Sequence, residues 1–327
     1  MILKPLFLSL FILPLCTFSA CAKTPATSVD SNGVPQTRSD LTDAEQQQLD
    51  DFVAKQKANM RFIEGGSFKM GDFGHKLDWT GGMPISSGGD NKSLHSVTLD
   101  NFSMNAYKAT FGDFDIYSLV TGQPKEGMQE SAETVRQSNA AAGIDWQTAQ
   151  HYCQWLGQQL DVSMSLPTEA QWEYAARNRG EYVLYPTDNG KVDGGRNVWT
   201  FAQIQEIRSK YNTSLAVPIV GLYPSNPLGL YDMTNQNYEW ISDWYAKDYY
   251  ANSPEHNPQG PDTGTEKVLR SVDANEGDAQ NIKFMGPVTV DRWHKEPNPP
   301  LINNNVRINQ NGDTTARCVA NSAQAIS

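Results

Sequence analysis

The chain has 327 residues, enough for one large domain or two small ones. Its 26 Lys and Arg against 37 Asp and Glu give a formal net charge of -11, which excludes a protein that binds nucleic acid through a basic face. Proteins, sugars, small molecules and cations remain as partners. With 39% hydrophobic and 10% aromatic residues the chain can bury a sizeable core, so wholesale disorder is not expected.

The first 20 residues have the pattern of a secretory signal peptide, with a positive start and an apolar run over residues 6–15. The run is too short for a permanent membrane-spanning helix. The next stretch, Phe-Ser-Ala-Cys at residues 18–21, resembles a bacterial lipobox with Phe where Leu is usual. We therefore expect a periplasmic protein with a lipid on Cys21, and Ala22 favours the outer membrane. Cleavage before Lys23 is the alternative and gives a soluble periplasmic protein.

Four cysteines are present, and two of them remain after export. Cys16 leaves with the signal peptide, and Cys21 is lipidated or also leaves. The remaining pair, Cys153 and Cys318, is most simply a disulfide in an oxidising compartment. Two free thiols with a redox or metal role are the alternative.

The rest of the chain divides by composition. Residues 21–41 are rich in Thr, Ser, Pro and Asn and predict a flexible tether. A capping box, Thr-Asp-Ala-Glu, begins at Thr42 and predicts a helix over residues 42–59. Residues 60–320 show no second linker and no repeat, so we expect one domain there, followed by a tail over residues 321–327.

Two more helices are expected inside the domain. Apolar residues recur at helical spacing between Trp146 and Leu156. A second capping box starts at Thr168, after Leu-Pro. Residues 251–265 and 295–315 look like long loops.

The motifs of the domain resemble those of the formylglycine-generating enzyme (sulfatase-modifying factor) family. The most specific stretch, Leu-Pro-Thr-Glu-Ala-Gln-Trp-Glu-Tyr-Ala-Ala-Arg at residues 166–177, is intact. Similar motifs follow the family's order at residues 60–71, 94–102, 144–157, 197–199, 229–234 and 239–245. The resemblance implies one α+β domain of the formylglycine-generating-enzyme fold, distantly like a C-type lectin, with much irregular structure. These motifs are mostly core residues, so they indicate the fold and not the chemistry.

The residues that would carry the family's chemistry are missing. Catalytic members hold copper with two thiolates in a Cys-x4-Cys segment upstream of a last Arg-Cys motif, here Arg317-Cys318. Counting back places the pair near residues 290–295, but no cysteine exists anywhere between Cys153 and Cys318. The resemblance also implies that these two cysteines are bonded to each other. We therefore assign no catalytic residue and expect no copper.

Two further departures follow from the comparison with the family's motifs. Its Arg-Gly-Gly-Ser-Trp becomes Arg-Ser-Val-Asp-Ala at residues 270–274, and its Glu-Val-Thr becomes Lys-Ala-Thr at residues 108–110. Sulfoxide-forming relatives use iron held by histidines. The five histidines here have no metal-binding spacing, so we expect no iron either.

A structural calcium site is expected between Asp232 and Glu239, because many oxygen ligands lie in eight residues. The resemblance implies side-chain ligands from Asp232 and Glu239 and backbone ligands from Asn235 and Asn237. Asn235 replaces a family glycine, and Asn tolerates the left-handed backbone that such a turn needs. The family's other calcium site would use Asn197 and Val198.

Three functions remain open. The first is a catalytically inactive, lipid-anchored protein that binds a protein partner, such as an immunity protein against a secreted toxin or a component of a secretion machine. Its surface would be the divergent segment 270–315, and the membrane is touched only through the anchor. The second is an oxidoreductase with altered metal chemistry that acts on an exported peptide or siderophore precursor. The third is a glycan or peptidoglycan-binding module, suggested by the many Trp and Tyr residues.

Overall fold

The computed structural model describes residues 28–128, 135–215, 217–234, 237–271, 275–276, 288–298 and 312–326. The helices in this part of the chain are α1 (Asp43–Ala58), α2 (Phe111–Thr121), α3 (Trp146–Gln159), α4 (Glu169–Ala176), α5 (Phe201–Lys210) and α6 (Tyr249–Asn252), with the short 3-10 helices η1 (Gly74–Lys76) and η2 (Asp78–Thr80). None of these described helices is long and apolar enough to cross a membrane.

The predicted helix starts are confirmed. The Thr42 hydroxyl accepts from the backbone N–H of Glu45, and the Glu45 carboxylate accepts from Thr42, so the capping box closes as predicted. Thr168 begins α4 in the same way, with Gln171 as the reciprocal partner. The helix predicted from the apolar spacing after Trp146 is α3.

The strands form two four-stranded sheets and two short pairs. One sheet has the order β1-β4-β12-β5 and is antiparallel throughout. The other has the order β10-β8-β7-β11, in which only β11 pairs in parallel. The bounds are β1 (Met60–Ile63), β2 (Gly66–Met70), β3 (His95–Leu99), β4 (Phe102–Asn105), β5 (Met164–Ser165), β6 (Trp199–Thr200), β7 (Tyr238–Trp244), β8 (Lys267–Arg270), β9 (Asn275–Glu276), β10 (Trp293–Lys295), β11 (Thr314–Thr315) and β12 (Val319–Ala320). The pairs β2-β3 and β6-β9 complete the set.

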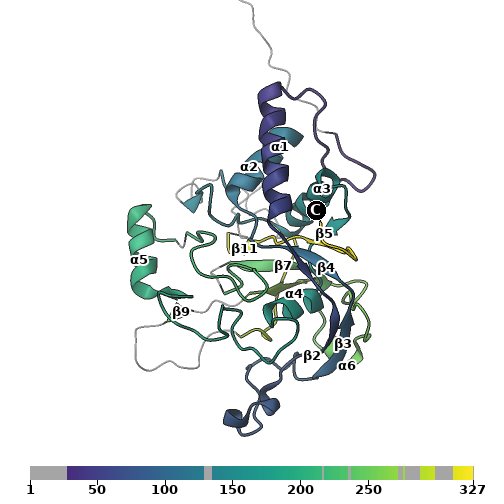
Figure 1. Cartoon of the computed structure of the whole chain (residues 1–327), viewed down its shortest axis with the longest axis vertical. Coiled ribbons are helices and arrows are strands. Elements are labelled where there is room, and N and C mark those ends of the chain that lie inside the picture. Colours follow the sequence, from purple (N-terminus) through teal and green to yellow (C-terminus); the bar gives the residue numbers. More distant parts are fainter. Residues whose placement is uncertain are drawn as a thin grey trace, which may run out of the picture.

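The architecture is α+β, as predicted, with much irregular backbone between short elements. Figure 1 shows α1, α2 and α3 gathered at one end of the molecule, with the sheets below them and α4 in the middle. One buried cluster joins the first three helices, and a second surrounds α4, β2, β3 and β4. Segments far apart in sequence therefore meet at the sheets, where the site residues lie.

The N-terminal segment differs from the expected tether over residues 28–41. Val34 is 1% exposed and packs into the helical cluster. The Trp155 indole donates to the Thr37 hydroxyl at 3.1 Å, and the Arg38 backbone N–H donates to the Val120 carbonyl at 2.8 Å. The packing of Val34 and Leu41 and several hydrogen bonds thus fasten a polar-looking stretch to the domain. Residues 21–27 and the expected lipidation site, Cys21, lie outside the described residues.

Candidate functional site

The carboxylate of Glu239, in β7, lies at the centre of a buried ionic cluster. Glu239 is 0% exposed. Arg317 binds both of its oxygens, with Nε and Nη2 each at 2.9 Å. The Trp172 indole donates to one of the same oxygens at 2.9 Å. This carboxylate is therefore oriented by protein donors on two sides.

The ammonium group of Lys108 lies on the same cluster. The Lys108 side chain is buried, and its Nζ donates to the Asn237 carbonyl at 2.5 Å. The same Nζ lies 3.9 Å from Oε1 of Glu239. Lys108 is also where the chain departs from the family's Glu-Val-Thr motif. A lysine thus occupies the side of the cluster where a cation would approach Asn237 and Glu239.

The donor set at Glu239 does not fit a calcium ion. Calcium takes six to eight oxygen ligands, and here two nitrogen cations already face the carboxylate and the Asn237 carbonyl. Asp232 adopts the left-handed backbone of a tight turn, and its Oδ2 accepts from the Gly221 backbone N–H at 2.7 Å. Asn235 lies outside the described residues. Within the described ranges, no group of three or more His, Cys, Asp or Glu residues could hold a metal ion.

Asn197 and Val198, the expected ligands of the second calcium site, lie in a separate loop. The Asn197 amide donates to Asp188 Oδ1 at 2.9 Å and to the Lys191 carbonyl at 3.0 Å, and its oxygen accepts from the Asp193 backbone N–H at 2.8 Å. The Val198 carbonyl accepts from the Gly195 backbone N–H at 2.8 Å. These atoms brace the loop against itself.

Cys153 and Cys318 are joined in a disulfide, with their Cα atoms 5.3 Å apart. The bond connects α3 to the residue before β12, and both cysteines are buried. The Cys318 carbonyl also accepts from the Asn105 backbone N–H at 2.9 Å, so the last motif is fixed to β4 as well.

A second ionic network lies under residues 288–295. This segment includes residues 290–295, where the family's copper-binding cysteine pair was expected. Arg292 donates from Nε and Nη2 to the two oxygens of Glu169, at 2.8 and 3.0 Å. Arg270 spans Glu169 and Glu173, at 2.9 Å from each. Burial raises the pKa of Glu169, but the charges of Arg292 and Arg270 outweigh it and hold that pKa below its usual value. The surface expected over residues 270–315 lies largely outside the described residues.

Asp243 adds a carboxyl to this network that forms no ion pair with any of the described residues. Its Oδ2 accepts from the Glu169 backbone N–H and from the Ser242 hydroxyl, at 3.1 Å each. Burial, reinforced by the charge of Glu169, raises the pKa of Asp243 to about 7. The group can therefore exchange a proton near neutral pH, inside the core.

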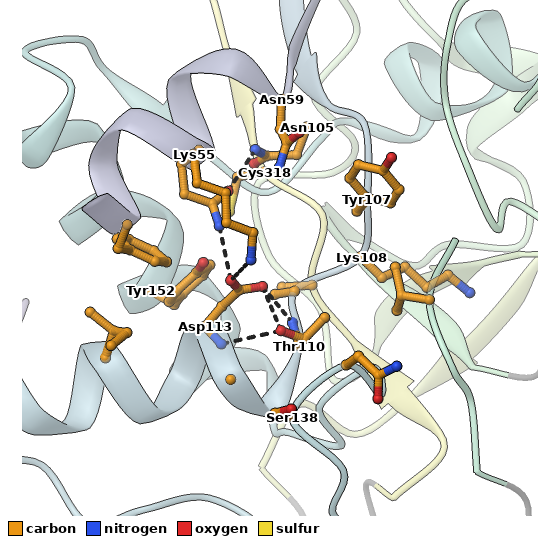
Figure 2. A pocket seen from close by; sticks show the side chains of 18 of the residues that line it. Lys55, Asn59, Asn105, Tyr107, Lys108, Thr110, Asp113, Ser138, Tyr152 and Cys318 are labelled. Atoms are coloured by element: carbon orange, nitrogen blue, oxygen red, sulfur yellow. Dashed lines mark hydrogen bonds and ion pairs between the residues drawn. The ribbon is translucent and has the colours of Figure 1, made fainter. Parts of the chain in front are cut away.

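A cavity of about 760 Å³ lies between α1 and the start of α2 (Figure 2). Asp113 anchors its floor, because its Oδ1 accepts from Lys55 at 2.9 Å and from Gln56 at 3.1 Å. Its Oδ2 accepts from the Thr110 backbone N–H and hydroxyl, which closes the capping box of α2. The charged groups around Asp113 are thus held in pairs that fasten α1 to α2. No sequence signal indicated this cavity, since its walls come from segments far apart in the chain.

A projecting loop over residues 72–92 carries large exposed apolar side chains. Trp79 and Met83 are 55% and 66% exposed. Asp72 fixes the base of the loop, accepting from the Gly74, Ile85 and Ser86 backbone N–H groups and from Lys92 at 2.9 to 3.2 Å. Burial raises the pKa of Asp72, but these hydrogen bonds, led by that of Lys92, hold it below its usual value. This loop was not predicted, although Trp79 and Met83 flank the paired glycines Gly81 and Gly82 in the sequence.

The short sheets, the irregular connections and the disulfide between α3 and the last motif define a protein of the formylglycine-generating-enzyme fold. The model of the "Sulfatase-modifying factor enzyme 1-like domain" matches residues 45–284, and the chain belongs to this family.

Similar proteins carry several different names. The chain is 28% identical to the formylglycine-generating enzyme of Streptomyces coelicolor over 254 residues, which cover 64% of this chain and 76% of that one. It is 29% identical over 231 residues to serine/threonine-protein kinase pkn1 of Chlamydia pneumoniae, covering 64% of this chain but only 32% of the kinase, about a third of its length. Among solved structures, PvdO from Pseudomonas aeruginosa has a TM-score of 0.56 at 21% identity, over 80% of this chain and 93% of that one. The likeness to PvdO shows the fold alone.

Proposed function

We propose that this protein is a non-catalytic member of its family that acts by binding another protein. One observation carries the proposal: the chain has no cysteine between Cys153 and Cys318, and these two are bonded to each other. The thiolate pair that the resemblance requires for copper has no residues left to supply it. The fold is kept while that chemistry is not.

The ionic network around Glu169 supports the same proposal. Arg292 and Arg270 use the buried carboxylates to fasten residues 288–295 and β8 to α4. Ion pairs this well satisfied hold a segment in one geometry and keep the Glu169 and Glu173 carboxylates paired with arginine. In this proposal the network is a structural brace.

The proposed lipid on Cys21 would orient the molecule. The covalent chain between Cys21 and Ser28 can span at most about 25 Å, and residues 28–41 are fastened to the helical end of the domain. That end would then face the membrane. Figure 1 shows the connection between β2 and β3 at the opposite end of the long axis from α1, so this loop would lie far from the membrane. Its sequence includes the exposed Trp79 and Met83.

We therefore propose the 72–92 loop as the contact surface for the protein partner. A braced loop that presents Trp and Met offers apolar contact area at little cost in ordering. The acidic net charge would speed the capture of a basic partner. The finer role, immunity against a toxin or membership of a secretion machine, depends on the identity of that partner.

A thiol titration distinguishes this proposal from the oxidoreductase. The exported protein is unfolded without reductant and its free thiols are counted. The proposal expects no free thiol other than an unmodified Cys21, together with no bound copper or iron in the folded protein. Two further thiols, or a stoichiometric transition metal that supports oxidation of a peptide, would favour the enzyme.

A further inference from the structure

We propose that the ammonium group of Lys108 is the resident cation of the oxygen cluster at the start of β7, so that this protein joins its central segments there without calcium. This cluster would stabilise the fold whether or not the protein binds a partner.

Lys108 belongs to the connection between β4 and α2, and its Nζ contacts the Asn237 carbonyl, 129 positions away in sequence, and the nearby Glu239. A buried ammonium needs acceptors for its hydrogens and a negative charge nearby. The carbonyl at 2.5 Å and the carboxylate at 3.9 Å provide both.

Arg317 completes the cluster from the other side. Its Nη1 donates to the Asn105 and Ala106 carbonyls at 2.9 and 2.7 Å, and its Nη2 donates to the Tyr231 carbonyl at 2.7 Å. Lys108 and Arg317 together thus connect β4, the turn before β7, β7 itself and the strand β12 that follows Arg317. In the described neighbourhood, Glu239 is the carboxylate that both cations share.

A divalent cation at this place would meet two fixed positive charges within a few ångströms of its ligands. The repulsion is strong because the site is buried and water cannot screen it. Calcium would also have to displace the buried Lys108 ammonium from the Asn237 carbonyl, which costs that ammonium a hydrogen bond. An ammonium tethered by its own chain needs no binding step and is always present.

The test compares full-length exported protein with its Lys108→Met variant, in EGTA and in calcium. Wild-type protein should unfold at the same temperature in both. Lys108→Met should unfold on the order of 10 °C lower in EGTA, since it removes the ammonium from the buried Asn237 carbonyl and leaves Glu239 with Arg317 as its one remaining described cation. Calcium should restore part of that loss, because the variant leaves oxygen ligands open.

Terbium serves as a local probe, because it takes the place of calcium and is excited by nearby indoles. The Trp172 indole donates to Glu239, so a lanthanide bound there should emit on tryptophan excitation. We expect calcium-displaceable emission from Lys108→Met and none from wild type. Lys55→Met is the matched control, since Lys55 pairs with Asp113 in the cavity. It should gain no calcium response.

Two results, one from terbium emission and one from thermal unfolding, would overturn the inference. One is wild-type protein whose calcium-displaceable, tryptophan-sensitised terbium emission is as strong as that of Lys108→Met. Another is Lys108→Met that is as stable as wild type in EGTA. If Lys108→Met does not fold, Lys108→Gln replaces it in the same comparison.

Discussion

Arg292 and Glu169 form a two-point ion pair across 123 positions of sequence, with N–O distances of 2.8 and 3.0 Å. Both side chains are almost completely buried. The Arg292 guanidinium also lies over the Tyr250 ring, 4.3 Å from its centroid. This pair fastens the residue directly before β10 to α4, the helix that carries the family's most specific motif.

Arg292→Ala should therefore destabilise the protein by about 3–5 kcal/mol, because it leaves a buried carboxylate with only Arg270 for charge balance. Urea denaturation of the two proteins measures the difference. Arg196→Ala is the matched control, because Arg196 pairs with Asp188 and Asp193 at the surface. It should lower the free energy of unfolding far less. Equal effects of the two changes would show that the Arg292 pair does not brace the fold.

Asp243 should make stability fall as pH rises toward neutrality. Its pKa is raised from 3.8 to about 7 in the folded protein, so between these values the folded state binds more protons than the unfolded state. The free energy of unfolding then decreases with rising pH over that window. Asp243→Asn keeps an oxygen for both hydrogen bonds and loses the charge.

The free energy of unfolding of Asp243→Asn, relative to that of wild type, should be about 3 kcal/mol higher at pH 8 than at pH 5. Urea denaturation at the two pH values gives this difference. The low pKa of Glu169 contributes a dependence only at more acidic pH, so it does not interfere. If the free energies of unfolding of the variant and wild type change equally between pH 5 and pH 8, Asp243 is ionised over that whole range.

Loss of the disulfide should cost up to about 5 kcal/mol, the loop-entropy value for the 165 positions between Cys153 and Cys318. The double change Cys153→Ala and Cys318→Ala should lower the unfolding temperature, and dithiothreitol should lower that of wild type similarly. Dithiothreitol should leave the double variant unchanged. A wild-type protein insensitive to reductant under unfolding conditions would contradict the bond.

Val34 should contribute far more to the stability of the protein than Val29, although both lie in the same polar segment. Val34 is buried, whereas Val29 is 56% exposed. Val34→Asp should cost about 3 kcal/mol and expose residues 28–41 to protease, because it places a charge among apolar side chains. Val29→Asp should change neither measurement. Equal protease sensitivity of wild type and Val34→Asp would instead support the prediction that residues 28–41 are a flexible tether.

The local features of the fold could be predicted from the sequence, because their signals lie within a few residues. Thr42 and Thr168 each have their capping partner three positions on. The ionic clusters could not be predicted, since Lys108 finds its acceptors 129 positions away and nothing near it in sequence marks it as buried. For the same reason the oxygen-rich run from Asp232 to Glu239 indicated calcium, while its chemistry depends on distant cations.

Quantitative co-purification from the native envelope tests protein binding most directly. Tagged wild-type protein is compared with the double variant Trp79→Ala, Met83→Ala and with Phe201→Ala, which alters another aromatic residue of similar exposure, 54%. We expect one stoichiometric protein to accompany wild type and Phe201→Ala and to be lost from the double variant, at equal unfolding temperatures. A protein that purifies alone, with a stoichiometric transition metal and turnover on an exported substrate, would contradict the proposal.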